Sequence, residues 1–247
     1  MREYKIVVAR YNEDIDWLAS EMHNCIIYNK GEKLGLSNEI CIPNVGRESE
    51  TYLNYIISNY ENLPDTIIFT QANIADHINF PGPRKKRLMI NYMNNTLSES
   101  DKLKITTCKI NHLHTFRKEA EQFGMSTGWL LKKSDKFNGK NGYRNWLSEN
   151  QEDWAAWESL KGQVSYLNDE RISFKDWFEK NLNQKFPKNE IIVQPNGIFA
   201  IKKSLILKND LNFYKNLIKL VNYGINPIEG HFFERSWQYI FNHKNEN

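Results

Sequence analysis

Apolar runs and polar stretches alternate along the first part of the chain. The apolar run Ile6–Ala9 is followed by the polar residues Arg10–Asp14. A short β-branched run of this kind is typical of a strand buried on both faces, as in the centre of a parallel sheet. From Ile15 onward apolar residues recur at helical spacing, and Asn12 or Asp14 could supply the N-cap. The pattern predicts an interior strand, a polar turn and a helix.

The same alternation continues to residue 71. Strands are predicted by four runs, which are Lys5–Ala9, Cys25–Tyr28, Ile40–Ile42 and Thr66–Gln71. Between the last two runs, the acidic residues of Asn44–Glu50 precede apolar positions at helical spacing, which predicts a second helix. Strand, helix and strand in this order form βαβ units, so we expect a mainly parallel sheet with Lys5–Ala9 inside it.

The second half of the chain predicts an excursion before strands return. Residues from about 117 to 187 are rich in Trp and charge, and we expect them to be mostly helical. Glu190–Gln194 and Ile198–Ile201 predict two strands joined by a Pro-Asn-Gly turn, either a hairpin or one bent strand. A further helix is predicted over Phe213–Val221. Because strands resume after the excursion, we expect one domain over residues 1–247 with a helical insertion.

Composition narrows the functional class. Of the 247 residues, 40% are hydrophobic and 26% are charged, which is typical of a soluble globular protein. The net charge of +3 is too small to favour a nucleic-acid partner. No apolar stretch approaches the roughly 18–20 residues of a membrane span, and the first strand begins too early for a signal peptide. Cys25, Cys41 and Cys108 lack a zinc-like spacing, so we expect reduced thiols in a cytoplasmic protein.

Several common catalytic motifs are absent from the sequence. There is no GxGxxG or GxxxxGK[ST] loop, no GxSxG elbow and no HExxH. This argues against the commonest dehydrogenase, NTPase, hydrolase and metalloprotease classes. What remains is polar residues after successive strands, at the edge where open α/β sheets bind ligands. These are Arg10–Asp14, Asn44–Glu48 and Gln71–His77, with Glu234 and Arg235 near the far end.

Six segments, in order, carry a resemblance to a known family. They are KIVVARYNEDIDWL, IYNKG, NVGRESETYLNYII, NYENLPDTIIFTQ, GIFAIKKSLI and ERSWQYIF. Together they resemble a widespread family of uncharacterised proteins from bacteria, fungi and viruses. That family is similar to glycosyltransferases of the GT-A fold and to galactofuranosyltransferase-like domains. The resemblance covers about residues 4–77 and 190–241, and it implies a GT-A-like α/β fold with a mainly parallel central sheet and helices on both faces.

The resemblance also implies a reaction. It implies a hexosyltransferase that moves a sugar from a nucleotide-sugar donor, expected to be UDP-linked, to a glycan or glycoconjugate acceptor in polysaccharide biosynthesis. Most GT-A enzymes hold a divalent cation with a DxD motif, but the comparable strand end here, Gln71–His77, contains one carboxylate. A single carboxylate makes a poor Mg²⁺ or Mn²⁺ site, so we expect no metal and no other cofactor. Cationic side chains can stabilise the leaving diphosphate instead.

The donor site is expected along the carboxyl edge of the sheet. Tyr11 and Arg10 would hold the base and ribose, with Asp14 or Asn12 accepting hydrogen bonds. The full set of expected donor-binding residues is Ala9, Arg10, Tyr11, Asn12, Asp14, Lys30, Arg47, Gln71 and His77.

Four cations are candidates for contact with the diphosphate. They are Arg47, Lys30 and Arg10 in the matched segments, with Arg235 behind them. An arginine fork suits the task because it can engage two phosphate oxygens at once. The alternative for each of them is an ordinary surface or salt-bridged cation, which would contribute nothing to ligand binding.

Glu234 is the expected general base. It is predicted at the start of a helix, and desolvation beside Phe232 and Phe233 would raise the pKa of its carboxyl group toward the range that a general base needs. The alternative is a helix-start acid paired with Arg235. Asp76, beside His77, is the second candidate, either as the base or as a contact to hydroxyl groups of the donor sugar.

Two other functions stay open on the sequence alone. One is a non-catalytic carbohydrate- or nucleotide-binding module of the same fold, and the other is a nucleotidyltransferase. A nucleotidyltransferase should carry a Gly-rich phosphate loop and paired carboxylates for Mg²⁺, and neither is found in the sequence. Trp146, Trp154 and Trp157 could stack on an acceptor sugar, although helix packing explains the spacing of the last two as well.

Overall fold

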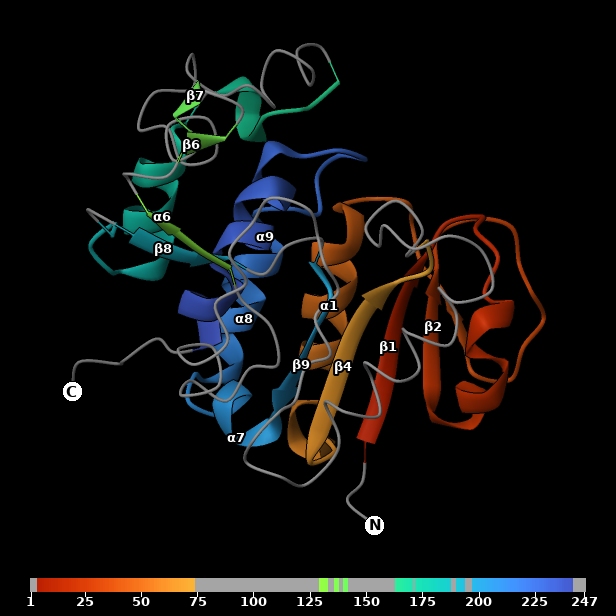
Figure 1. The fold of residues 1–247 in the computed structure, drawn as a ribbon. Coiled ribbons are helices and arrows are strands. Elements are labelled where there is room, and N and C mark those ends of the chain that lie inside the picture. Colours follow the sequence, from red (N-terminus) through yellow and green to blue (C-terminus); the bar gives the residue numbers. More distant parts are fainter. Residues whose placement is uncertain are drawn as a thin grey trace.

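The centre of the molecule is a mixed β-sheet (Figure 1). The computed structural model describes residues 4–73, 129–132, 136–137, 140–141, 163–170, 172–187, 190–193 and 197–241. Within these residues five strands form the central sheet in the order β3-β2-β1-β4-β9. They are β1 (Tyr4–Arg10), β2 (Cys25–Asn29), β3 (Glu39–Cys41), β4 (Thr66–Gln71) and β9 (Phe199–Lys202). The neighbouring pairs are parallel except β4 and β9, so the α/β class and the mainly parallel sheet are confirmed.

The strand β1 occupies the interior position that its apolar run predicts. Ile6, Val7 and Val8 have no exposed surface, and Ile6 lies between Cys25 of β2 and Ile68 of β4 in the register. Val7 belongs to the hydrophobic cluster on one face, whereas its two neighbours belong to the cluster on the other. Alternate side chains therefore anchor two separate layers.

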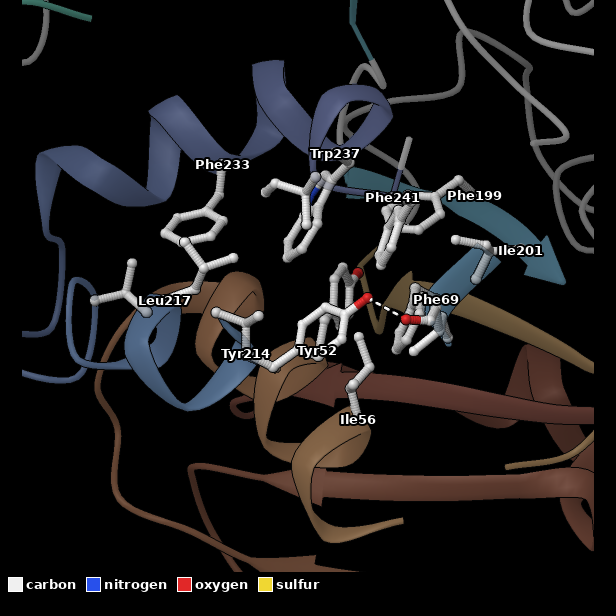
Figure 2. Close-up of a cluster of buried hydrophobic side chains, with 14 of the residues drawn as sticks. Tyr52, Ile56, Phe69, Phe199, Ile201, Tyr214, Leu217, Phe233, Trp237 and Phe241 are labelled. Atoms are coloured by element: carbon white, nitrogen blue, oxygen red, sulfur yellow. Dashed lines mark hydrogen bonds between the residues drawn. The ribbon is translucent and has the colours of Figure 1, made fainter. Parts of the chain in front are cut away.

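One face of the sheet is covered by α-helices. The helices α1 (Arg47–Ser58) and α9 (Ile228–Phe241) lie against the sheet, while α8 (Leu211–Ile218) packs on α1 and α6 (Phe174–Leu182) packs on α9. The short α7 (Lys203–Ile206) follows β9. Figure 1 shows α1, α8 and α9 gathered beside β4 and β9. Figure 2 shows Trp237 of α9 pointing toward Tyr52 of α1, and Phe233 pointing toward Leu217 of α8. The Tyr52 ring is 4.6 Å from that of Phe69 on β4. This aromatic layer fixes α9 over the sheet.

The opposite face is covered by the 3₁₀ helix η1 (Asp16–Asn24). Leu18 and Trp17 pack there against the sheet, and the Trp17 indole donates a hydrogen bond to the Ala72 carbonyl at 2.9 Å. The predicted helix therefore exists, but the predicted N-cap is wrong. The cap position is Ile15, and it makes no side-chain cap hydrogen bond. Asp14 instead accepts from the Asp16 amide inside the turn, at 2.7 Å.

The predicted hairpin near residue 195 is also wrong. The strand β8 (Glu190–Val193) pairs antiparallel with β5 (Trp129–Lys132), whereas β9 pairs with β4. Phe199 lies opposite Phe69 in that register and is fully buried. The two strands therefore belong to different sheets, and β9 joins the central sheet beside the aromatic layer. The Pro-Asn part of the turn lies outside the described residues.

The expected helical excursion is described only in part. Besides α6 and the 3₁₀ turn η4 (Leu167–Asp169), its described residues include β5, β6 (Lys136–Phe137) and β7 (Lys140–Asn141). Another 3₁₀ turn, η2 (Tyr60–Asn62), follows α1. The single domain over residues 1–247 stays a prediction. Among the described residues, no helix combines the length and hydropathy that crossing a membrane requires.

Candidate functional site

The helix α1 begins with an unusual turn at the carboxyl edge of the sheet. Gly46 and Arg47 both have left-handed backbone angles, with φ of 66° and 52°. A Cβ atom at Gly46 would lie 2.4 Å from the Glu50 side chain and 2.8 Å from the Val221 carbonyl oxygen. The Gly46 amide also donates to the Gly224 carbonyl at 2.8 Å. A glycine is therefore required at position 46. The turn also sets the direction of the Arg47 side chain, because Arg47 is the first residue of α1.

Lys30 stabilises this turn. It directly follows β2, and its ammonium group donates to the carbonyls of Val45 and Arg47, the latter at 2.6 Å. It also pairs with Glu50 at 2.9 Å, and both side chains are almost fully buried. Burial lowers the pKa of Lys30, while the Glu50 carboxylate acts in the opposite direction. Since an ammonium group has three donors, this predicted phosphate ligand has none left over.

Arg10 is likewise engaged inside the protein. Its side chain is buried and donates to the Asn29 side chain at 2.8 Å and to carbonyl oxygens of the two neighbouring loops, among them that of Glu32 at 3.0 Å. Asn12, also a predicted donor contact, accepts from the Glu32 amide at 2.8 Å. Tyr11 remains half-exposed. Arg10 therefore holds the strand-end loops together, and we do not keep it among the candidate phosphate ligands.

Arg47 is the predicted cation that keeps an accessible guanidinium group. The side chain is 35% exposed. Its Nη1 contacts Oδ1 of Asn226 at 3.2 Å and Nε2 of His231 at 3.1 Å, and its Nε lies 3.5 Å from Glu48. Within the part of the chain that the structure describes, no acceptor contacts Nη2. Arg47 can therefore still offer one edge of its fork to an anionic ligand.

Glu234 lies in the middle of α9, so its predicted place at a helix start is wrong. The apolar pattern from Trp237 onward suggested a later start, whereas the helix begins at Ile228. The Glu234 side chain is 18% exposed and lies 3.8 Å from Arg235, a loose contact. It is one turn from Gly230, against which the Arg47 methylenes lie, since a Cβ at Gly230 would be 3.3 Å from Cδ of Arg47. The Arg47 stem therefore lies against α9 one helical turn before Glu234.

A second carboxylate, Glu48, was not among the predicted site residues. It follows Arg47 in the first turn of α1 and lies beside Gly197, where a Cβ would be 3.2 Å from its Cγ. The Tyr52 hydroxyl donates to the Gly197 carbonyl at 2.8 Å. Burial raises the pKa of Tyr52 well above its ordinary value, and the charges of Glu48 and Glu234 add to this. Both carboxylates therefore lie near the same buried hydroxyl.

His231 was also missed by the sequence analysis. Burial, followed by the charges of Arg47 and Arg235, lowers its pKa to about 2, so the imidazole is neutral. Arg235 is itself buried, and it donates to the His231 carbonyl at 2.5 Å. Burial also lowers the pKa of Arg235. Because its side chain is only 5% exposed, Arg235 is not open to a phosphate ligand. The signal for His231 was its spacing of three residues before Glu234, on the same helix.

We refer to Arg47, Glu48, His231 and Glu234 as the Arg47 site. It combines a partly exposed guanidinium group with two carboxylates and a neutral imidazole at the amino end of α1. Such a set can bind an anionic group and accept a proton beside it. Within the described ranges, no cluster of three or more His, Cys, Asp or Glu side chains could hold a metal ion.

The remaining predicted site residues lie along the same edge or outside the described residues. Gln71 ends β4 and is paired with Ala9 of β1, whose carbonyl accepts from the Ala72 amide at 2.9 Å. Asp76 and His77, as well as Trp146, Trp154 and Trp157, lie outside the described residues. Their predicted roles stay predictions.

A separate hollow lies at the other end of β4. Its volume is about 430 Å³, and it is lined by Asp65, Thr66, Lys202, Lys203, Ser204 and Leu207. Thr66 is the first residue of β4, so the hollow is at the amino edge of that strand and contains none of the predicted site residues. Because ligands of open α/β sheets bind at the carboxyl edge, we keep the Arg47 site as the candidate.

Comparison with known proteins identifies a family. A sequence model for a family described as "Protein of unknown function (DUF3431)" matches residues 6–247. No curated protein and no solved structure matches the chain. The match begins within β1 and extends beyond α9, so it includes every residue of the Arg47 site.

Proposed function

Because the chain belongs to the DUF3431 family of proteins of unknown function, we infer its activity from its own site, and we propose a glycosyltransferase. The enzyme moves a sugar from a UDP-linked donor to a hydroxyl group of a glycan or glycoconjugate, on a GT-A-like fold and without a divalent cation. The observation that supports this most is the Arg47 site, where a partly exposed arginine lies 3.5 Å from Glu48 and packs against α9 one helical turn before Glu234.

The diphosphate leaving group needs positive charge as its bond to the sugar breaks. Arg47 can supply the two N–H groups of its Nη2 to phosphate oxygens, and the amino end of α1 adds its partial positive charge. The acidic residues of this turn do not cancel that charge entirely, because Glu50 is already paired with Lys30. Arg47 thus takes the role that a metal ion has in DxD enzymes.

The reaction needs a base beside the leaving group. The acceptor hydroxyl oxygen attacks the anomeric carbon, the bond from that carbon to the diphosphate breaks, and its electron pair leaves with UDP. The hydroxyl proton passes to Glu234, which is partly exposed and lies one helical turn after the residue against which the Arg47 stem packs. Asp76 is the alternative base, and the half-exposed Tyr11 at the end of β1 is the candidate platform for the base of the nucleotide.

Calorimetry with UDP tests the donor site. We expect UDP to bind the full chain in the presence of EDTA. Arg47→Ala should weaken this binding by about 1.5–3 kcal/mol, or roughly 10- to 150-fold in Kd, because a charge-assisted contact is lost. Lys208→Ala is the control and should bind UDP as the wild type does. Lys208 is exposed and follows α7, which comes after β9 in the chain. UDP binding that appears only after Mn²⁺ is added would contradict the metal-free proposal.

Turnover with a panel of UDP-sugars and acceptors tests the chemistry in the same preparation. Glu234→Gln should lower turnover by roughly 10²- to 10⁴-fold and leave the Kd for UDP nearly unchanged. Glu61→Gln, at an exposed carboxylate, is the matched control. If UDP binds but the wild type consumes no donor with any acceptor, the chain is a binding module instead.

A further inference from the structure

We infer that His231 is a positioning residue for Arg47, holding the guanidinium group so that its Nη2 edge meets the diphosphate of the ligand. The inference rests on the proposed function for the identity of that ligand. It starts from the 3.1 Å contact between Nη1 of Arg47 and Nε2 of His231.

The chemistry of this contact fixes the tautomer of the imidazole. An arginine has five N–H donors and no acceptor, and it stays protonated in proteins. Nε2 of His231 must therefore be the acceptor, which places the ring proton on Nδ1. A doubly protonated ring would have no acceptor and would repel the guanidinium group. His231 is buried to 9% exposure between Arg47 and Arg235, which keeps the ring neutral.

A second acceptor supports the same orientation. Oδ1 of Asn226 lies 3.2 Å from Nη1, and the amide nitrogen of Asn226 donates to the Gln163 carbonyl at 2.8 Å. That second bond settles which way the amide points, since its NH₂ end is engaged elsewhere. Nη1 is therefore held from two directions, while Glu48 lies near Nε at 3.5 Å.

This arrangement leaves Nη2 for the ligand. Among the described residues, no acceptor contacts it, and the Arg47 stem rests on Gly230. A long arginine side chain normally loses rotamer freedom when it binds a phosphate. Here the protein has already fixed the side chain, so less entropy is lost on binding. The two N–H groups of Nη2 point in different directions, so they can reach oxygens of adjacent phosphate groups, as in a diphosphate.

Two substitutions of His231 separate positioning from packing. His231→Leu keeps the bulk and removes the acceptor, whereas His231→Gln can place an amide oxygen near the position of Nε2. We measure the Kd of inorganic pyrophosphate and of UDP by calorimetry on the full chain, with thermal melting as the check on folding. We expect a roughly fivefold weaker Kd for the leucine variant and a Kd within about twofold of wild type for the glutamine variant.

A double-mutant cycle identifies the route of the effect. In an Arg47→Ala background, His231→Leu should change the Kd of pyrophosphate by less than about twofold, because the group that it positions is gone. The same fivefold loss in both backgrounds would overturn the inference. So would a leucine variant that binds both ligands as the wild type does, even though the proposed function would then stand.

Spectroscopy of the wild type tests the inference without any variant. Long-range ¹H–¹⁵N correlation spectra should show His231 protonated on Nδ1 and not on Nε2, and the opposite tautomer would overturn the inference. If pyrophosphate binds with the expected variant pattern but UDP does not bind, His231 positions Arg47 as inferred and the proposed function fails. If the wild type binds neither ligand, both fail.

Discussion

At the scale of single residues, the turn that starts α1 is the feature on which the site depends. Gly46 and Arg47 adopt left-handed angles in succession, and Lys30 donates to carbonyl oxygens on both sides of this pair. A non-glycine residue with such an angle costs of order 1–3 kcal/mol unless its surroundings compensate. The hydrogen bonds from Lys30, whose ammonium group is paired with Glu50, hold this turn in place.

The turn can be tested with two glycines that share a left-handed angle. Gly46→Ala places a Cβ against the Glu50 side chain and the Val221 carbonyl, whereas a Cβ at Gly35 would meet nothing within 4 Å. Both substitutions carry the angular cost, and Gly46→Ala carries the steric cost as well. Urea unfolding should therefore show Gly46→Ala to be less stable than Gly35→Ala by about 1–3 kcal/mol. Equal losses would mean that the turn relaxes freely.

The sequence predicted residues of the site better than it predicted their roles. Arg47 could be named because it lies in one of the segments that carry the family resemblance. Nothing local distinguished it from Lys30 or Arg10, however, since a cation looks the same in sequence whether it is buried in an ion pair or left accessible. Their partners, Glu50 and Asn29, are close by only in the folded chain. The role of His231 depends equally on Arg47, 184 residues away.

At the scale of elements, the strands β1, β2 and β4 and the helix α1 follow from local pattern alone. Their apolar runs have the right period and are bounded by clear turns. The partner of β9 could not be predicted from the sequence. The apolar pattern of a strand does not tell whether it pairs with the nearest strand in the chain or with the edge strand of a distant sheet. The aromatic layer decided in favour of β4. The start of α9 was misplaced because its first turn mixes charged and apolar residues.

The helix α9 depends on its aromatic face, and Trp237 is the residue that tests this. Its ring is fully buried and lies 5.9 Å from Tyr52 and 5.4 Å from Phe233 (Figure 2). Trp237→Ala should lower the free energy of unfolding by about 3–5 kcal/mol through the lost burial and the cavity left behind. Trp237→Phe should cost clearly less, because most of the aromatic contact remains. Denaturant titration of both variants measures the difference. If the two variants lost similar amounts of unfolding free energy, the size of the indole ring, rather than the aromatic packing of α9, would determine the stability.

At the scale of the whole molecule, His231 should make stability depend on acid. Its pKa is about 2 in the folded protein and about 6.5 in an unfolded chain. Between these values the unfolded state binds the extra proton, so stability is full above pH 6.5 and falls as the pH drops toward 2. The contribution of His231 to the loss between pH 8 and pH 5 is about 2 kcal/mol.

Urea unfolding at pH 8 and pH 5 measures this contribution. In His231→Gln the loss of stability between the two pH values should be smaller than in the wild type by about 2 kcal/mol. His23→Gln, at an exposed histidine, is measured alongside as the matched substitution. An unchanged loss in His231→Gln would show that the imidazole gains a proton in the folded state.

The pairing of β4 with β9 has a consequence for the newborn chain on the ribosome. After residue 71 has been synthesised, the edge of β4 stays unpaired until Phe199 and the other residues of β9 have been synthesised. At 5–20 residues per second this delay lasts roughly 6 to 26 s. Throughout it, an unpaired strand edge and the aromatic side of α1 are open to other nascent chains, which favours aggregation. Chaperones that shield such surfaces should therefore raise the yield of folded protein.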